Sequence, residues 1–384
     1  MKASPRSAPG ARPLRILEIG GHELFVHAVP QQTEFFWIGL KPRHRANRAF
    51  GPLRALRALG KLRRGEFDLL VLHAHQHAPW HPRSFLTVLR DWNIRAPAAL
   101  FGIFASRFLL RFHDIPIAVI DLDDPCIIGR HNFVLLDRCR AFFKRELPSD
   151  HWLVFCKSGY PNFPGRRWRS KERYRRRIGK LKPISLGIPP PRHLPVATEK
   201  KADIFFAGAI ESNSTVRVAG MNELKALADE GYVIDIATER LPPPAFMQRL
   251  SAAWLAWSPG GLGWDCARHY EAPLAGTVPL MNDPTILRHR PLRDGEQCVL
   301  YRVEPGGLAE AARRTLADKA RLRQMAEAAA AHICEHHSYR ARAEYVAATV
   351  LGRRLDGTRI EAAEPSAEGT HAANVKPAVG ATGG

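Results

Sequence analysis

The stretch from Trp254 to Asn282 constrains the fold of this chain more than any other segment. Its sequence, WLAWSPGGLGWDCARHYEAPLAGTVPLMN, predicts a short apolar strand, a glycine-rich turn, a helix and a second apolar strand. A helix between two apolar strands is typical of a parallel sheet in an α/β domain. In such sheets ligands bind where the carboxyl ends of strands meet the starts of helices. The segment therefore predicts both a fold class and the place of a ligand site.

The same segment carries the groups that a nucleotide sugar requires. Backbone N–H groups of a glycine-rich turn can approach a phosphate, and a helix start adds a partial positive charge. Arg268 can hold a diphosphate through two hydrogen bonds. Glu271, on the same helix, can accept hydrogen bonds from sugar hydroxyls. We therefore expect Arg268 and Glu271 to face one ligand.

The helix and the strand after it resemble a family signature. Residues 271–279 read EAPLAGTVP, which fits the pattern E-A-x-x-x-G-x-x-P in the donor-binding domain of two-domain glycosyltransferases of the GT-B type. A Ser-Pro-Gly turn followed by W-x-x-x-R-x-x-E-A-x-x-x-G-x-x-P is most similar to the exostosin-like branch. The resemblance covers residues 202–350 well and the N-terminal half weakly. It implies transfer of a sugar from a nucleotide-sugar donor to a hydroxyl of a glycan, a lipid-linked acceptor or a small molecule.

One position departs from the family pattern. Many retaining members carry a Glu eight positions before the matched Glu, and this chain has Gly263 there. No residue at that position can take the role that the family gives to that first Glu. The sequence therefore leaves open whether transfer retains or inverts the configuration at the anomeric carbon. The departure also raises an alternative function, a catalytically silent glycosyltransferase-like interaction module.

Length and patterning predict two domains. A chain of 384 residues suits two domains of ordinary size, and alternating strand-like and helical runs predict doubly wound parallel sheets. The resemblance implies two Rossmann-like domains facing a cleft. We expect a disordered leader over 1–13, an acceptor-side domain over 14–190, a nucleotide-sugar-binding domain over 191–352 and a disordered tail over 353–384. The strands expected in the first domain are 14–19, 35–40, 68–72, 117–122 and 152–155.

Further donor-site candidates flank the signature. The strand ending in FFAGA is followed by a Ser/Asn/Thr-rich loop that can cap the next helix, which carries Arg217. In the glycosyltransferase interpretation that loop encloses the donor at Gly208, and Arg217 contacts the diphosphate. The full set of expected donor-side residues is Gly208, Arg217, Ser258, Gly261, Gly263, Arg268, His269, Glu271 and Thr277.

The acceptor base has three candidates in the first domain. His22 follows two glycines after the first strand, and an imidazole titrates near neutral pH. Asp124 lies in VIDLDDP, beside Asp121 and Asp123. The third candidate is a histidine group after the strand at 68–72, formed by His73, His75, His77 and His81. The expected catalytic set is therefore His22, Asp124 and Glu271, with the base left open.

No cofactor or metal is expected besides the donor, which is a substrate. The three aspartates invite comparison with the D-x-D metal motif of the other glycosyltransferase fold. The resemblance to the GT-B type implies instead that arginines and a helix start neutralise the diphosphate. We therefore interpret Asp121, Asp123 and Asp124 as acceptor-side or loop-capping carboxylates.

The formal charge of +20 is concentrated in two segments, Lys41–Gly65 and Pro164–Lys182. Basic clusters of this kind bind nucleic acid, anionic membranes or acidic substrates. A basic nucleic-acid-binding protein is thus another alternative function, but aromatics are sparse in these runs, Trp168 and Tyr174 among them, and no binding motif is evident. The first segment contains a basic amphipathic helix suited to anionic lipid.

Six scattered cysteines without a C-x-x-C pair indicate a reducing compartment. We expect a cytoplasmic protein, free or held peripherally on the membrane.

Overall fold

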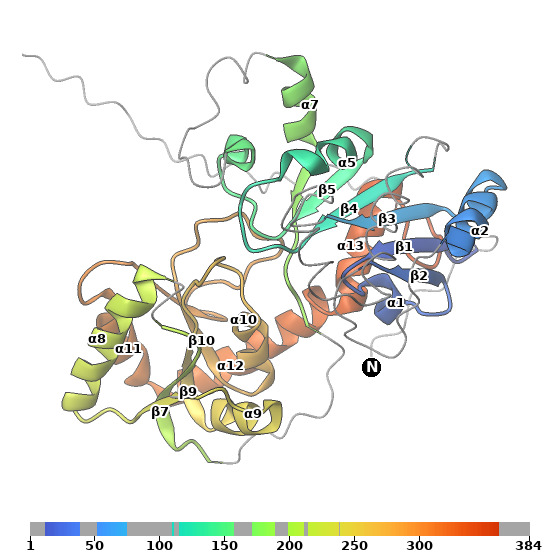
Figure 1. The fold of residues 1–384 in the computed structure, drawn as a ribbon. Helices are drawn as coiled ribbons and strands as arrows, with labels where there is room; N and C mark the ends of the chain where they lie inside the picture. Colours follow the sequence, from blue (N-terminus) through green and yellow to red (C-terminus); the bar gives the residue numbers. More distant parts are fainter. Residues whose placement is uncertain are drawn as a thin grey trace, which may run out of the picture.

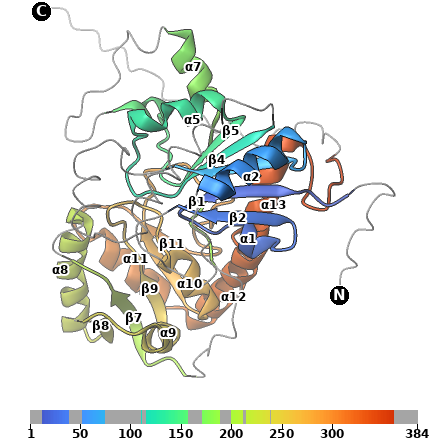
Figure 2. The same ribbon diagram turned by 45° about the vertical axis from the view of Figure 1, so that its right-hand side comes forward.

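The chain folds into two α/β lobes, each built on one parallel sheet (Figure 1). The computed structural model describes residues 12–38, 52–74, 110, 115–156, 171–188, 199–210, 214–237 and 239–360. In Figures 1 and 2 two consecutive helices, α12 (Lys319–His336) and α13 (Tyr339–Leu351), run from the second lobe back to the first.

The first sheet has six parallel strands in the order β2-β1-β3-β4-β5-β6. They are β1 (Ile16–Gly20), β2 (Thr33–Trp37), β3 (Leu69–His73), β4 (Ile117–Asp121), β5 (Ala141–Lys144) and β6 (Leu181–Pro183). The helices described in this lobe are α1 (Phe25–Ala28), α2 (Pro52–Arg63), η1 (Arg130–Asn132), α5 (Phe133–Arg138), η2 (His151–Phe155) and α7 (Glu172–Gly179). Strands β1, β3, β4 and β5 are buried along their whole length, as expected for parallel strands covered on both faces.

Alternate residues of each strand enter two different cores, because successive side chains point to opposite faces of a sheet. Leu17 and Ile19 pack in a core shared with α2 and α5. Ile16 packs in a second core shared with α13. Register pairs such as Asp121 with Lys144 align the carboxyl ends of the strands at one edge. That edge carries the polar residues of the first lobe.

The second sheet has five parallel strands in the order β11-β10-β9-β7-β8. They are β7 (Ala202–Ala207), β8 (Ile234–Ala237), β9 (Ala253–Trp257), β10 (Val278–Asn282) and β11 (Val299–Tyr301). The helices of this lobe are α8 (Thr215–Asp229), α9 (Pro243–Ser251), α10 (Arg268–Leu274), α11 (Gly307–Leu316) and α12. Both sheets reverse strand order beside their first strand, at β1/β3 and at β7/β9. Ligands of doubly wound folds bind at such a reversal.

The two doubly wound α/β sheets match the fold class predicted from the sequence. Some elements differ. Residues 152–155, expected as a strand, form the 3-10 helix η2. The strands β5 and β6 were not predicted, because Lys and Arg flank their short apolar runs and hide the strand pattern. No helix among the described residues is long and apolar enough to cross a membrane.

The ends of the chain also differ from the expected boundaries. The helix α13 lies within the range 191–352 assigned to the second domain, yet Ala343, Val346 and Ala347 are fully buried against the first sheet. The expected disordered tail begins folded, because Leu355 is fully buried and its carbonyl accepts a hydrogen bond from the Leu14 N–H at 3.0 Å. The first lobe is therefore completed by the C-terminal helix and the residues after it.

Candidate functional site

The carboxyl edges of the two sheets meet at the lobe boundary. Glu146, two residues after β5, accepts hydrogen bonds from the backbone N–H groups of Trp264 (2.8 Å) and Asp265 (2.9 Å). Nearby, the Leu287 N–H donates to the Leu147 carbonyl at 2.7 Å. The glycine-rich turn after β9 is therefore held between its own sheet and the first lobe.

Two arginines converge on the carboxyl edge of the second sheet. Arg217, in the first turn of α8, donates from Nη1 to the Ala209 carbonyl at 2.7 Å. Arg268, at the start of α10, donates from Nη1 to the Ala207 carbonyl at 2.9 Å. Burial and the neighbouring Arg268 lower the pKa of Arg217. The two guanidinium groups are thus brought together although their charges repel.

Part of this arginine pair has no hydrogen-bond partner. Nε of Arg217, and Nε and Nη2 of Arg268, are buried and make no hydrogen bond. No carboxylate among the described residues forms an ion pair with either side chain. Uncompensated buried donors of this kind are costly, because they lose water without gaining an acceptor. An anion with several oxygens would satisfy them.

Two glycines give that anion room. A Cβ on Gly208 would lie 3.2 Å from Arg268 Nη1, and one on Gly261 would lie 2.5 Å from Arg217 Nη2. A side chain at either position would press on a guanidinium group. Gly208 is exposed and Gly261 is partly exposed, so both are open to solvent. The arginine pair, Gly208 and Gly261 together form the candidate donor-side site, and all four are among the residues expected from the sequence.

Glu271 lies in the first turn of α10, as its spacing to the glycine and proline of the signature predicts. Burial and the charge of Cys266 raise the pKa of its carboxyl, while Arg268 lowers it. Its carboxylate makes no hydrogen bond to any residue that the structure describes. Glu271 is thus a half-buried acceptor next to the arginine pair, in a position to receive a hydroxyl.

Two expected donor-side residues, His269 and Ser258, lie behind the turn. His269 is buried, and its Nε2 lies 3.0 Å from the Ser258 carbonyl. Ser258 is also buried, and its hydroxyl lies 3.2 Å from Cys266 Sγ. Burial alone would raise the pKa of Cys266, but His269 and Arg268 lower it to about 5. Burial alone would lower the pKa of His269, but Cys266 and Asp265 raise it to about 10. His269 and Ser258 therefore shape the turn from inside and do not face a ligand.

Thr277 and Gly263 do not lie where a ligand contact was expected. Thr277 is buried at the opposite, amino-terminal edge of the sheet, where its hydroxyl donates to the Leu250 carbonyl at 2.7 Å. It precedes β10, and only the residues that follow a parallel strand reach the ligand-binding edge. Gly263 lies at the correct edge, but the carboxylate of Glu146 occupies the space beside it.

The first candidate base lies after β1. His22 is half-buried, and its ring centroid lies 5.5 Å from that of His73. The Nε2 of His73 lies 3.1 Å from Oε1 of Glu18, and both residues are buried. His73 is thus part of an interior pair. His75, His77 and His81 lie outside the described residues.

The aspartates after β4 have different partners. Asp121 accepts from Lys144 Nζ at 3.0 Å, and Asp124 is ion-paired with Arg145. Asp123 forms no ion pair with any residue that the structure describes, and burial together with repulsion from Asp121 raises its pKa to about 6. Asp124, the expected catalytic aspartate, is therefore held by an arginine, whereas Asp123 carries the perturbed carboxyl.

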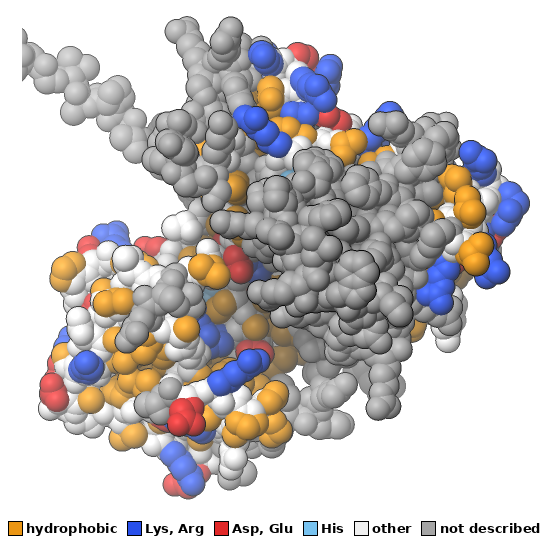
Figure 3. Space-filling view, in the orientation of Figure 1, with side chains coloured by type: hydrophobic (Ala, Val, Ile, Leu, Met, Phe, Trp, Pro, Cys, Tyr) orange, Lys and Arg blue, Asp and Glu red, His pale blue; other side chains and the backbone are white. Residues whose placement is uncertain are grey.

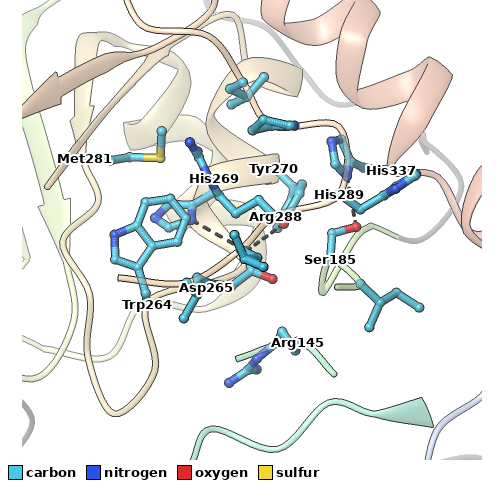
Figure 4. A pocket seen from close by; sticks show the side chains of 15 residues that line it. Arg145, Ser185, Trp264, Asp265, His269, Tyr270, Met281, Arg288, His289 and His337 are labelled. Atoms are coloured by element: carbon cyan, nitrogen blue, oxygen red, sulfur yellow. Dashed lines mark hydrogen bonds and ion pairs between the residues drawn. The ribbon is translucent and has the colours of Figure 1, made fainter. Parts of the chain in front are cut away.

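A small interior space of about 30 Å³ lies at the lobe boundary, enough for a water or two. Figure 4 shows Arg145 on one side and Trp264, Asp265 and Tyr270 on the other, with Ser185 bonded to His337. Neither arginine of the donor-side site lines this space. It is a packed junction between the lobes.

Sequence reasoning missed two residues at this boundary. Glu146 sits in a run of charged residues after β5 and matches no motif, and Asp123 differs from its neighbours only in what surrounds it. One sequence signal was available: Gly263 stands where the family pattern has a Glu, so a carboxylate from elsewhere in the chain could be sought at that place. Only the folded structure identifies which residue it is.

Comparisons with known proteins were made on sequence and on structure. The sequence model of the glycosyl transferase-like family matches residues 261–348. No curated protein sequence matches the chain. Sucrose-phosphate synthase from Thermosynechococcus elongatus is similar in structure, with 13% identity, 86% of this chain and 96% of that chain covered, and a TM-score of 0.48.

Two further solved structures are similar over most of this chain. HepE of Anabaena, in complex with UDP, has 11% identity, covers 88% of this chain and 99% of its own, and gives a TM-score of 0.46. The apo form of the lipopolysaccharide outer core galactosyltransferase WaaB has 10% identity, the same coverage, and a TM-score of 0.48.

The two doubly wound parallel sheets form the two-domain α/β architecture expected of the GT-B type. The match to the glycosyl transferase-like family covers residues 261–348, a region that includes Arg268 and Glu271. The narrower similarity to the exostosin-like branch stays a prediction.

Glu271→Gln distinguishes a ligand role from a helix-stabilising one. Gln keeps the size of the side chain and one acceptor oxygen but loses the charge. If Glu271 orients the donor, the transfer rate should fall on the order of 100-fold, because misplaced reacting groups carry a large kinetic cost. The melting temperature should hardly change.

Glu310→Gln is the matched control, because Glu310 is the acidic residue in the first turn of α11. A carboxylate at that position contributes about 0.3–1 kcal/mol to helix stability. Because Glu310 stabilises its helix without belonging to the candidate site, Glu310→Gln should retain full turnover. Full transfer activity in Glu271→Gln, measured by steady-state kinetics, would contradict the assignment of Glu271 to the site.

Proposed function

We propose that the enzyme binds the diphosphate of a nucleotide sugar between Arg217 and Arg268 and transfers the sugar to a hydroxyl acceptor. The observation that supports this most is the set of buried, unpartnered N–H groups on the two arginines. A diphosphate supplies several oxygens at the spacing that guanidinium donors bind. Gly208 and Gly261 leave space for it beside the guanidinium groups.

The arginines would act on the leaving group. As the bond between sugar and diphosphate breaks, negative charge grows on the diphosphate, and fixed cations stabilise that charge in the transition state. Glu271 would hold hydroxyls of the sugar or of the ribose. With two guanidinium groups already present, the reaction would need no metal ion.

The acceptor base would be Asp123. Asp124 is ion-paired with Arg145 and Asp121 with Lys144, so each of these carboxylates already has a cation as its partner. Asp123 has a carboxyl pKa near 6, matched to proton abstraction close to neutral pH. Arg145 links this aspartate loop to the donor turn, because a Cβ on Gly263 would lie 3.0 Å from Arg145 Nη2. His22 is the competing candidate.

Arg268→Ala tests the donor site. Binding of UDP and GDP, measured by isothermal titration calorimetry, should weaken by roughly 10- to 100-fold, since a charged hydrogen bond contributes about 1.5–3 kcal/mol. Arg249→Ala is the control, because Arg249 is a half-buried arginine of the same lobe that is already paired with Asp235. Equal affinity in wild type and Arg268→Ala would contradict the proposal, as would loss of folding in that variant alone.

The pH profile tests the base. An aspartate base must be ionised, so kcat/KM should rise about tenfold per pH unit below a pKa of about 6 and level off above it. Asp123→Asn should remove this limb and lower kcat by roughly 100-fold or more. His22→Gln should leave the limb in place. The reverse result, with the limb lost only in His22→Gln, would assign the base to His22.

The acceptor side offers a contact with an anionic membrane. Leu53 and Leu56 on α2 are 73% and 65% exposed, beside Arg54 and Arg57. Figure 3 shows apolar side chains and Lys or Arg side chains together over this end of the first lobe. Exposed leucines among basic residues suit insertion into a lipid interface. We propose that α2 holds the enzyme peripherally on an anionic membrane, near a lipid-linked or glycan acceptor.

Vesicle flotation tests this contact. Vesicles of phosphatidylcholine with phosphatidylglycerol should retain the protein at low salt and release it as salt rises, because the attraction is screened. Leu53→Ser/Leu56→Ser should reduce retention. Val218→Ser/Val233→Ser, which changes two exposed apolar residues of the second lobe, should not. Equal retention on pure phosphatidylcholine vesicles would rule out an electrostatic role.

A further inference from the structure

Glu146 belongs to the first lobe but binds the donor turn of the second. Its Oε2 accepts from the Trp264 N–H at 2.8 Å and its Oε1 accepts from the Asp265 N–H at 2.9 Å. The residue is 3% exposed. Nε of its neighbour Arg145 lies 3.4 Å from Oε1. A buried carboxylate thus accepts hydrogen bonds from both N–H groups at the end of the turn.

Gly263 makes room for that carboxylate. A Cβ at this position would lie 2.6 Å from Glu146 Oε1 and 2.7 Å from its Cδ. The backbone of Gly263 is not in the left-handed region, unlike that of Gly276 or Gly306. Glycine is therefore required here for space and not for its backbone conformation. Gly263 and Glu146 are therefore complementary, because Gly263 has no side chain in the space that the Glu146 carboxylate fills.

The turn between these contacts is rigidly held and touches the arginine pair. Within it, the Gly261 N–H donates to the Gly263 carbonyl at 2.8 Å. From its own sheet, Asn282 Oδ1 accepts from the Gly260 N–H at 2.8 Å. From the other lobe, Glu146 holds the far end. Because Gly261 packs against Arg217, a shift of the turn would move the site at which the diphosphate is proposed to bind.

We propose that Glu146 is a positioning residue of the donor site, supplied by the first lobe, which fixes the glycine-rich turn only when the two lobes are together. The inference rests on the proposed function. Glu146 also occupies two N–H groups that a phosphate could otherwise take, which directs the diphosphate to Arg217 and Arg268. The donor site and the contact between the lobes are then linked through one carboxylate.

The geometry allows the carboxylate to be moved to the other lobe. In Glu146→Ala/Gly263→Asp, the Cβ of the new aspartate would lie 2.6 Å from the position that Glu146 Oε1 occupies in the wild type. Its carboxyl carbon is bonded directly to that Cβ. Aspartate readily accepts hydrogen bonds from backbone N–H groups two or three residues further on. The double variant should therefore restore the contact to the turn from within the second lobe.

The experiment compares Glu146→Ala, Gly263→Asp and the double variant. Affinity for UDP and GDP is measured by calorimetry, and turnover as release of nucleoside diphosphate from a panel of nucleotide sugars. Glu146→Ala should lose on the order of 100-fold in kcat/KM, as a displaced site does. Gly263→Asp should lose as much, through its clash with Glu146. The double variant should recover at least about tenfold over either single variant.

Two further variants keep the test decisive. Glu146→Ala/Gly263→Ala fills the space without a carboxylate and should not recover activity. Glu146→Gln keeps the shape of the side chain but turns an N–H donor toward the turn, so it should lose kcat/KM while its melting temperature stays near that of wild type. Wild-type kinetics in Glu146→Gln, or a folded Glu146→Ala/Gly263→Asp variant that is no better than the single variants, would overturn the inference. A wild-type enzyme that binds no nucleoside diphosphate would instead overturn the proposed function.

Discussion

The arrangement of the two lobes depends on a buried carboxylate, that of Asp265. Its side chain accepts from the Leu186 N–H, in the segment that joins the lobes, at 2.7 Å and from the Tyr270 hydroxyl at 2.6 Å. Its own N–H donates to Glu146 of the first lobe. Burial alone would raise the pKa of Asp265, but these hydrogen bonds and His269 lower it. A charge buried in this way is tolerated only while every partner is present, so the linker, the donor helix and the first lobe are fixed together.

Charge is distributed differently on the two sides of the boundary. In the first lobe Asp121 is ion-paired with Lys144, and Asp124 is ion-paired with Arg145. In the second lobe Arg217 and Arg268 have no carboxylate partner among the described residues. Balanced charges favour a stable scaffold, whereas unbalanced cations favour an anionic ligand. The contrast supports the proposal that the donor binds to the second lobe while the first lobe supplies positioning and proton transfer.

The expected residues that the structure brings together at the carboxyl edge of the second sheet share one property, which is that local backbone structure determines their position. Arg268 and Glu271 are three residues apart on one helix, so they face the same side wherever that helix packs. Gly208 and Gly261 follow strands whose ends must lie at the ligand-binding edge of a parallel sheet. Thr277 was misplaced because the pattern did not distinguish a residue before a strand from one after it. His269 and Ser258 were misjudged because burial depends on what packs behind the turn.

By itself, the sequence predicted the two doubly wound sheets and placed Arg217 and Arg268 at the carboxyl edge of the second one, because these features follow from short-range periodicity and spacing. It did not determine which carboxylate stands free. Asp123 and Asp124 are neighbours of the same type, and only the approach of Arg145 from another strand makes them differ. Nor did it pair Glu146 with Gly263, which are more than a hundred residues apart. Only the tertiary structure decided these points, because hydrogen bonds and burial between distant segments exist only once the lobes are packed together.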